Sequence, residues 1–501
     1  MTSFETSDAG LQGDFGLLSP VSASPEVAAL TGDRAVLAAI LRVEAAWAAV
    51  LDEAGLVPAG SAAVVAEAAD AGRYDLAGIA VRAQGGANPV IPLLADLRAQ
   101  VKALDTAGIG AVRAVHTSLT SQDVLDSALM LLARDAIRRL LGELTATSAA
   151  LSGLAEQHAE TLCVGRSLTQ HSLPFTFGLK AAQWFAGLAA AGRRLETLEL
   201  PVQTGGAAGT LAAGTVLTAG SSVTPFDLSD RLAAGLGLAP VPAPWHTNRL
   251  AVTALGDGLA AVTDAAGKIA VDVLFLSRPE VAEVAEPRAA GRGGSSAMPQ
   301  KQNPVLSVLI RSAALQAPGQ AAQLHLAAAN FNDERPDGAW HSEWPALRQL
   351  LRLALGAAGQ LRELTEGLRV FPDAMRRNLD LAGPLLLSEA VTAALAPLLP
   401  GNGAGKNGAD GKQRLQAVVD QTLQAPAREQ AATYRRLLRA AVPPEQLSDA
   451  RLEELLDPAN YLGQAAEISR RLLAAYPEYA RAAAGTADAP PTPDLNGAFR
   501  G

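Results

Sequence analysis

Long apolar helical segments separated by short polar motifs dominate the hydropathy pattern of this chain. After Thr31-Gly32-Asp33, and as far as about Ala54, apolar side chains recur at the three- and four-residue spacing of one helix face. Further helices are expected over 124–144, 176–200, 250–276 and 305–330, with another after Pro345. These helices are apolar around much of their circumference, so other helices must surround them. The pattern therefore predicts an all-α protein that buries part of its surface in an oligomer.

Changes in segment length divide the chain into three expected domains. Residues 1–112 form a small N-terminal helical domain, 113–370 a central bundle of long helices, and 371–501 a small C-terminal helical domain. The Gly- and Asn-rich run at 399–413 cannot bury apolar area, so we expect a mobile loop there. The tail from Ala483 has three prolines and little apolar content, and we expect it to be disordered.

Composition narrows the classes of protein. Of 501 residues, 49% are hydrophobic and only 4% aromatic, which favours helices over strands. The net charge of −9 argues against a nucleic-acid partner. The single cysteine, Cys163, leaves no intramolecular disulfide and suits a reducing cytoplasm. The acidic N-terminus is unlike a signal peptide, and four charges within 250–276 argue against a membrane span. We therefore expect a cytoplasmic protein with neither nucleic-acid nor membrane partners.

The most informative polar motif is the run Gly-Gly-Ser-Ser-Ala-Met-Pro-Gln-Lys-Gln-Asn-Pro at 293–304. Its glycines allow the loop to bend and move. Ser295 brings a hydroxyl and Lys301 a positive charge, and Pro304 presets the first turn of the next helix. A serine acts as a base only when its alkoxide is stabilised, which a nearby cation would do. The simpler interpretation of the glycines and serines alone is a flexible connector.

The polar run at 115–123 is a candidate carboxylate site. Ser121 stands where an N-cap belongs, before the helix expected from Val124. The hydroxyls of Thr120 and Ser121, with the free amides of the first turn, could bind a carboxylate. The same residues could instead cap the helix and do nothing more.

Two further polar runs each contain one residue with a candidate role. His171, within 165–174, lies among hydroxyls and an amide, and is either a proton-transfer group or a structural histidine. Arg335, within 332–345, could bind a carboxylate through two N–H groups or pair with the acid at 333 or 334. The residues alone leave these alternatives open.

Together these motifs resemble those of the fumarase/aspartase superfamily. The run at 293–304 matches its signature loop, G-S-S-x-M-P-x-K-x-N-P, and 115–123 is similar to its segment H-x-G-x-T-S-x-D. The string E-R-x-x-G-A-W-H-x-E-W at 334–344 closely resembles bacterial 3-carboxy-cis,cis-muconate cycloisomerases, and 86–92 is similar to the same branch. The resemblance covers residues 20 to 480.

The resemblance implies a three-domain all-α fold whose long central helices are shared in a homotetramer with composite active sites. It implies that Ser295 moves the carbon-bound proton, that Lys301 and Asn303 stabilise its alkoxide, and that His171 transfers a proton or orients the substrate. No metal or organic cofactor is implied. The residues expected to bind the carboxylates of a small polycarboxylate substrate are His116, Thr120, Ser121, Gln203 and Arg335.

Four positions depart from family patterns: Ser118 replaces a glycine, Gln302 an arginine, Val308 a glutamate of the lyases, and Leu168 a histidine of many adenylosuccinate lyases. Cycloisomerases also lack the glutamate. The predicted activity is therefore conversion of 3-carboxy-cis,cis-muconate to 4-carboxymuconolactone, in protocatechuate degradation, by intramolecular carboxylate addition. The alternatives are an adenylosuccinate-type C–N lyase, another lyase that releases a small group from a substituted succinate, and a catalytically silent structural relative.

Overall fold

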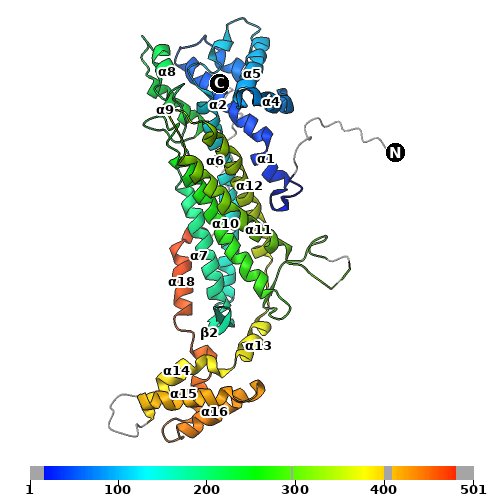
Figure 1. The fold of residues 1–501 in the computed structure, drawn as a ribbon, viewed down its shortest axis with the longest axis vertical. Coiled ribbons are helices and arrows are strands. Elements are labelled where there is room, and N and C mark those ends of the chain that lie inside the picture. The colour runs from blue at the N-terminus through cyan, green and yellow to red at the C-terminus, as the bar shows by residue number, and fades with distance from the viewer. Residues whose placement is uncertain (1–15, 295–296, 299, 400–408, 481–501) are drawn as a thin grey trace. The chain divides into compact units, whose positions relative to one another are not determined.

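The computed structural model describes residues 16–294, 297–298, 300–399 and 409–480 (Figure 1). Helices dominate these residues and the strands are short, so the prediction of an all-α protein is confirmed. Most of the expected loop at 399–413, and the whole tail from Ala483, lie outside the described residues.

The helices in the first part of the chain are α1 (Pro25–Thr31), α2 (Asp33–Glu53), α3 (Ser61–Ala68), α4 (Leu76–Ala83), α5 (Val90–Leu104), α6 (Ser121–Gln157), α7 (Phe177–Glu196), α8 (Ala212–Leu217), α9 (Pro225–Leu236) and α10 (Leu250–Leu276). Those that follow are α11 (Val305–Ala328), α12 (Gly338–Glu366), α13 (Pro372–Ala382), α14 (Ser388–Leu395), α15 (Ala409–Leu423), α16 (Gln430–Ala441), α17 (Asp449–Leu455), α18 (Ala465–Ala475) and α19 (Pro477–Ala480). The strands are β1 (Leu162–Ser167), β2 (Gln170–Thr176), β3 (Val284–Ala285) and β4 (Arg369–Val370).

Contacts along the backbone group the chain into two compact units. The first unit comprises Met1–Leu144, Ala190–Ala270 and Leu306–Leu361, and the second comprises Thr145–Ala189, Val271–Val305 and Arg362–Gly501. The boundary falls inside α6, α7, α10 and α12. The division into three consecutive domains stays a prediction.

Helix α2 supplies much of the N-terminal core of the first unit. Its apolar spacing places Ile40, Trp47 and Val50 on one face, and all three side chains are buried. The helix packs against α3 and α9. The helix predicted after Asp33 and ending at about Ala54 is confirmed, and it begins one residue earlier, at Asp33.

Small residues let the long helices of the first unit approach one another closely. A Cβ atom at Gly256 of α10 would lie 2.6 Å from Leu324 Cδ1 of α11, and one at Gly267 would lie 2.5 Å from Ala314 Cβ. The helix α10 has the predicted bounds. A larger side chain at Gly267 would push α11 away from α10, whereas one at Gly256 would first displace the Leu324 side chain.

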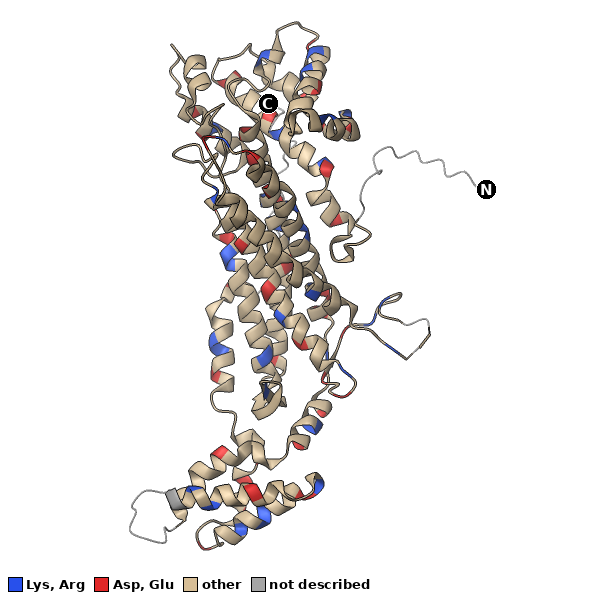
Figure 2. Ribbon diagram, viewed as in Figure 1, with Lys and Arg blue, Asp and Glu red and all other residues tan. Residues whose placement is uncertain are grey.

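One face of α11 is apolar and exposed in the single chain. Val308, Leu315 and Leu326 are 51%, 73% and 61% exposed. Their spacing is close to whole helical turns, so they lie along one side of the helix. Charged residues are sparse along the long helices, where tan ribbon predominates (Figure 2). This face of α11 is therefore a candidate contact surface for another subunit.

Within the described part of the chain, no single helix is both long and apolar enough to cross a membrane. One bent pair, Pro372–Ala382 with Pro384–Leu398, reaches that length and composition only when its two arms, which meet at 78°, are added together.

Two helices begin earlier than the sequence predicts. The helix α6 begins at Ser121, and the Val124 N–H donates to the Thr120 carbonyl at 3.4 Å. Thr120, not Ser121, therefore immediately precedes the first turn. The helix α12 begins at Gly338, so Pro345 lies inside it. Buried side chains in the turns before this proline hold the helix there, although the proline removes one backbone hydrogen bond.

Residues 162–176 form a β-hairpin that the hydropathy pattern does not predict. Strands β1 and β2 are antiparallel, with Arg166 opposite His171. Leu168 and Thr169 form the turn with φ of +50° and +69°. An isolated two-stranded hairpin is marginally stable, but β1 also packs against α13 in the second unit. The hairpin therefore depends on a tertiary contact, which the hydropathy pattern of 162–176 does not reveal.

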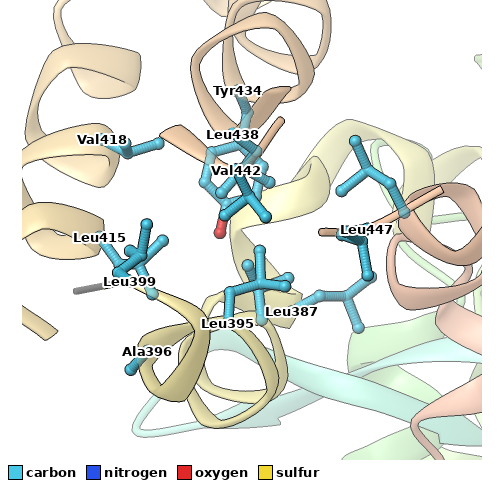
Figure 3. Close-up of a cluster of buried hydrophobic side chains, with 12 residues drawn as sticks. Leu387, Leu395, Ala396, Leu399, Leu415, Val418, Tyr434, Leu438, Val442 and Leu447 are labelled. Atoms are coloured by element: carbon cyan, nitrogen blue, oxygen red, sulfur yellow. The ribbon is translucent and has the colours of Figure 1, made fainter. Parts of the chain in front are cut away.

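The C-terminal helices of the second unit enclose a separate apolar cluster (Figure 3). Leu395 of α14 is fully buried, and Leu415 of α15 and Leu438 of α16 are nearly so. Because these helices bury their apolar faces against one another, they form a local core, and its residues lie within the range 371–501 of the expected C-terminal domain.

Two glycines provide a test of the packing between α6 and α7 in the second unit. A Cβ at Gly178 of α7 would lie 2.6 Å from the Ala155 carbonyl oxygen and 2.7 Å from that of His158, whereas one at Gly153 of α6 would meet no described atom within 4 Å. Gly178→Ala should therefore lower the free energy of unfolding by about 1–3 kcal/mol. Gly153→Ala should raise it by about 0.5–1 kcal/mol. Urea unfolding at one fixed protein concentration measures both, and equal effects would contradict the packing described.

Candidate active site

The start of α6 brings together two of the predicted substrate-binding residues. Arg335 Nη1 donates to Thr120 Oγ1 at 2.8 Å, and Arg335 Nε donates to Gln122 Oε1 at 3.4 Å. Within the described residues, Arg335 bonds to these groups rather than forming an ion pair with the acids at 333 and 334. These bonds use two of five guanidinium N–H donors, so the others can reach a carboxylate.

Asp123, buried in the first turn of α6, joins three segments of the first unit. Its Oδ2 accepts hydrogen bonds from the backbone N–H of Thr120 and of Gly206, both at 2.9 Å. Its Oδ1 lies 2.7 Å from His246 Nε2. One carboxylate thus binds the loop at 115–120 (the Thr120 loop), the glycine-rich segment at 203–210 and the segment before α10.

His246 is buried against the glycine-rich segment. Because the Asp123 carboxylate accepts, His246 Nε2 carries the proton, and Nδ1 has no hydrogen-bond partner among the described residues. A Cβ at residue 205 would lie 2.6 Å from His246 Cε1. Glycine at this position is therefore needed for the imidazole to approach.

One turn farther along α6, Asp126 binds the buried Arg249. Asp126 Oδ2 and Oδ1 accept from Arg249 Nη1 at 2.8 Å and Nη2 at 3.0 Å, and Glu343 Oε2 accepts from Arg249 Nη2 at 2.7 Å. The guanidinium also lies over the rings of Trp245 and Phe331, at 4.6 and 5.0 Å. Both acids are buried, so their charges are tolerated only because they are paired.

The pKa values in this network follow from burial and pairing. Burial raises the pKa of Glu343 to about 6, although the charge of Arg249 opposes the shift. Burial alone would lower the pKa of Arg249, but Asp126 and Glu343 together raise it. The arginine therefore stays charged, while Glu343 titrates near neutral pH.

Gln203 is buried within this network. Its backbone N–H donates to Ser127 Oγ at 2.9 Å. Its side-chain Oε1 accepts from the backbone N–H of Trp245 at 2.9 Å, and its Nε2 lies 3.4 Å from Asp126 Oδ2. Both ends of the side-chain amide thus have protein partners. Its substrate-binding role stays a prediction.

The turn that begins with His116 has an unusual backbone. His116 and Ser118 have φ of +60° and +65°, in the left-handed region. Ser118 stands where relatives usually carry glycine, so the turn keeps the backbone shape that glycine favours. His116 Nδ1 lies 2.7 Å from Glu44 Oε1. Ser121, at the first position of α6, is half-buried.

The other predicted residues belong to the second unit. Ser295 lies outside the described residues. Lys301 is exposed, and its backbone N–H donates to the Met298 carbonyl. The backbone N–H of Asn303 donates to the Gly293 carbonyl at 2.8 Å. His171 is exposed on β2. The roles of these four residues stay predictions.

Gln302, which departs from the family arginine, ties the base of the signature loop. Its side-chain Nε2 donates to the Arg292 carbonyl at 3.0 Å, and residues 294 and 302 form an antiparallel bridge. A neutral amide therefore ties the loop at the position where the superfamily resemblance predicts an arginine.

Six buried residues with ionisable side chains were not predicted as site residues from the sequence: Glu44, Asp123, Asp126, His246, Arg249 and Glu343. The available signal was a charged or imidazole side chain inside an otherwise apolar helical pattern, since such groups are rarely buried without a partner. No group of three or more His, Cys, Asp or Glu side chains in the described residues could hold a metal ion.

Comparison with known proteins identifies the family. Residues 22–319 match the family model described as "Lyase". The chain is 45% identical to the nitrosuccinate lyase of Streptomyces davaonensis, over 90% of this chain and 93% of that protein. It is 39% identical to the 3-carboxy-cis,cis-muconate cycloisomerase of Pseudomonas aeruginosa, over 89% of this chain and 93% of that protein. The crystal structure of the 3-carboxy-cis,cis-muconate lactonizing enzyme from Pseudomonas putida superposes with a TM-score of 0.80 at 34% identity, covering 92% of this chain and 99% of that one. The chain belongs to the lyase family of the fumarase/aspartase superfamily, as the motifs predict.

The raised pKa of Glu343 predicts a pH-dependent stability. Between about pH 4.5 and 6 the folded protein binds more protons than the unfolded chain, so the free energy of unfolding falls as pH rises. Glu343→Gln, which mimics the protonated acid, should abolish this slope and raise the free energy of unfolding at pH 7 by up to about 2 kcal/mol. Urea midpoints at pH 5, 6 and 7 measure it. Asp380→Asn, in an exposed pair with Arg376, is the control, and an unchanged slope in Glu343→Gln would refute the assignment.

Proposed function

We propose that this member of the lyase family releases a small leaving group from a 2-substituted succinate to give fumarate, with nitrosuccinate as the leading substrate. The observation that carries the proposal is the hydrogen bond from Arg335 to Thr120 at the start of α6, which leaves other guanidinium donors for a substrate carboxylate. The 45% identity to a nitrosuccinate lyase over nearly the whole chain supports this choice of substrate.

The reaction requires a carbanion next to a carboxylate. In the proposed mechanism the Ser295 alkoxide removes a proton from C3, and the electron pair spreads onto the adjacent carboxylate as a dianion. Fixed donors and cations lower this barrier, and Lys301 and Asn303 supply them at the serine. Collapse of the dianion forms the C2–C3 double bond as the C2–N bond breaks. The products are fumarate, nitrite and the proton held by Ser295.

The leaving group fits one departure from the family. Lyases that expel an amine need an acid to protonate it, and a glutamate paired with the histidine favours that acid form. Here Val308 stands at the glutamate position. Nitrite is a weak base and departs without protonation, so His171 need only orient the substrate.

A second candidate is the predicted cycloisomerase, with 3-carboxy-cis,cis-muconate as substrate. The 39% identity to one such enzyme and the structural likeness to another support it. In this reaction a carboxylate of the substrate adds across the double bond, and Ser295 donates a proton to the carbanion that results. Both candidates use the same stabilised dianion and need no cofactor. Retention of Ser295, Lys301, Asn303 and His171 argues against a silent structural relative.

We also propose a homotetramer with composite active sites. The exposed apolar face of α11, with Val308, Leu315 and Leu326, is the surface that another subunit would cover. Burial of this face would explain why so long a helix carries a single charged residue, Arg311.

A substrate panel tests the proposed reaction. Purified protein should release nitrite and fumarate in equal amounts from nitrosuccinate, and Ser295→Ala should lower kcat by at least about 1000-fold. Nitrite is measured by diazo coupling and fumarate by its absorbance. Loss of diene absorbance with 3-carboxymuconate, without nitrite release from nitrosuccinate, would favour the cycloisomerase. Full turnover by Ser295→Ala would refute the role of the serine in either reaction.

Mixing two inactive variants tests the composite site. If Ser295 and Arg335 of one site come from different subunits, an equal mixture of Ser295→Ala and Arg335→Ala protein, unfolded and reassembled together, should recover up to about one quarter of wild-type activity. Each variant reassembled alone is the control. A mixture as inactive as its components would contradict a composite site.

A further inference from the structure

A second carboxylate–imidazole pair lies beside the Thr120 loop, and its carboxylate comes from α2. Glu44 Oε1 lies 2.7 Å from His116 Nδ1. The Glu44 side chain is fully buried, whereas the His116 side chain keeps 13% of its surface exposed. Glu44 Oε2 is buried without a hydrogen-bond partner among the described residues. A buried carboxylate is costly unless it is paired, and the partner here is His116.

The same face of α2 also holds the backbone of this turn. Trp47, one turn beyond Glu44, donates its Nε1–H to the Thr117 carbonyl at 2.7 Å. His116 and Ser118 adopt left-handed backbone conformations, which are unfavourable for residues with a Cβ. Two contacts from one helix face therefore stabilise a turn that its own sequence disfavours.

This geometry decides which ring nitrogen is left for a ligand. Because Glu44 occupies Nδ1, only Nε2 of His116 remains to bind a substrate carboxylate. An imidazole can donate to two carboxylates at once only when both nitrogens carry protons. When His116 binds a substrate carboxylate in this way, the Glu44 carboxylate lies where it balances the charge of the imidazolium.

We propose that Glu44 is a positioning residue that holds His116 as a carboxylate-binding cation, with Nδ1 toward α2 and Nε2 toward the substrate. This inference rests on the proposed function, because it requires a substrate with more than one carboxylate. Glu44 does not touch the substrate, so its effect passes through His116.

A double-mutant cycle tests this coupling. Glu44→Ala should raise KM for nitrosuccinate, and Kd for the non-reacting dicarboxylate succinate, about tenfold while kcat changes less than about threefold. The isosteric Glu44→Gln, which keeps an acceptor but loses the charge, should raise both about threefold. In a His116→Ala background, Glu44→Ala should change either constant less than about twofold. If 3-carboxymuconate is the substrate turned over, it replaces nitrosuccinate.

The controls separate the possible failures. Asp257→Asn removes the carboxylate of an exposed imidazole pair, Asp257 with His325 at 3.0 Å, and should leave both constants unchanged. A Glu44→Ala effect of equal size with and without His116 would overturn the positioning role in favour of packing. Wild-type affinity for succinate in Glu44→Gln would overturn it too, even if Glu44→Ala fails to fold. A wild-type protein that neither binds succinate nor turns over either substrate would overturn the proposed function, and this inference with it.

Discussion

The candidate site depends on one buried carboxylate–imidazole hydrogen bond and one buried ion pair, which hold the start of α6 to the segment before α10. Asp123 pairs with His246 and Asp126 pairs with Arg249. Asp123 and Asp126 lie one turn apart on α6, and their partners His246 and Arg249 lie three residues apart in the non-helical segment before α10. Paired charges are tolerated in the interior, but either partner alone would be strongly destabilising. The Asp123–His246 and Asp126–Arg249 contacts therefore fix the position of the Thr120 loop.

The half-buried Arg335 differs from the buried part of this cluster, where carboxylates outnumber the one guanidinium, Arg249. The interior of the cluster is rich in carboxylates, and one of them, Glu343, titrates near neutral pH because burial raises its pKa to about 6. The outer edge presents the Arg335 guanidinium instead, bound to a hydroxyl and an amide. A protein with a net charge of −9 can bind a polycarboxylate only if its positive charge is concentrated in this way.

The departures from the family are informative once their geometry is known. Ser118 keeps the left-handed backbone of the glycine it replaces, so the turn does not require glycine. Gln302 ties the base of the signature loop with a neutral amide, where the superfamily resemblance predicts an arginine. Val308 is exposed on an apolar face of α11. Two of these three departures thus have a structural counterpart: a left-handed turn at Ser118 and a side-chain hydrogen bond at Gln302.

The sequence by itself determined the all-α class, the helices α2 and α10 and the family, because helical periodicity and contiguous motifs are local. It also indicated Thr120 and Arg335, although they meet across 215 positions of the chain. Only the tertiary structure decided the partners of Asp123 and Asp126, each 123 positions away, and the hairpin at 162–176. Burial and long-range pairing set these features, and neither is encoded in the pattern of neighbouring residues.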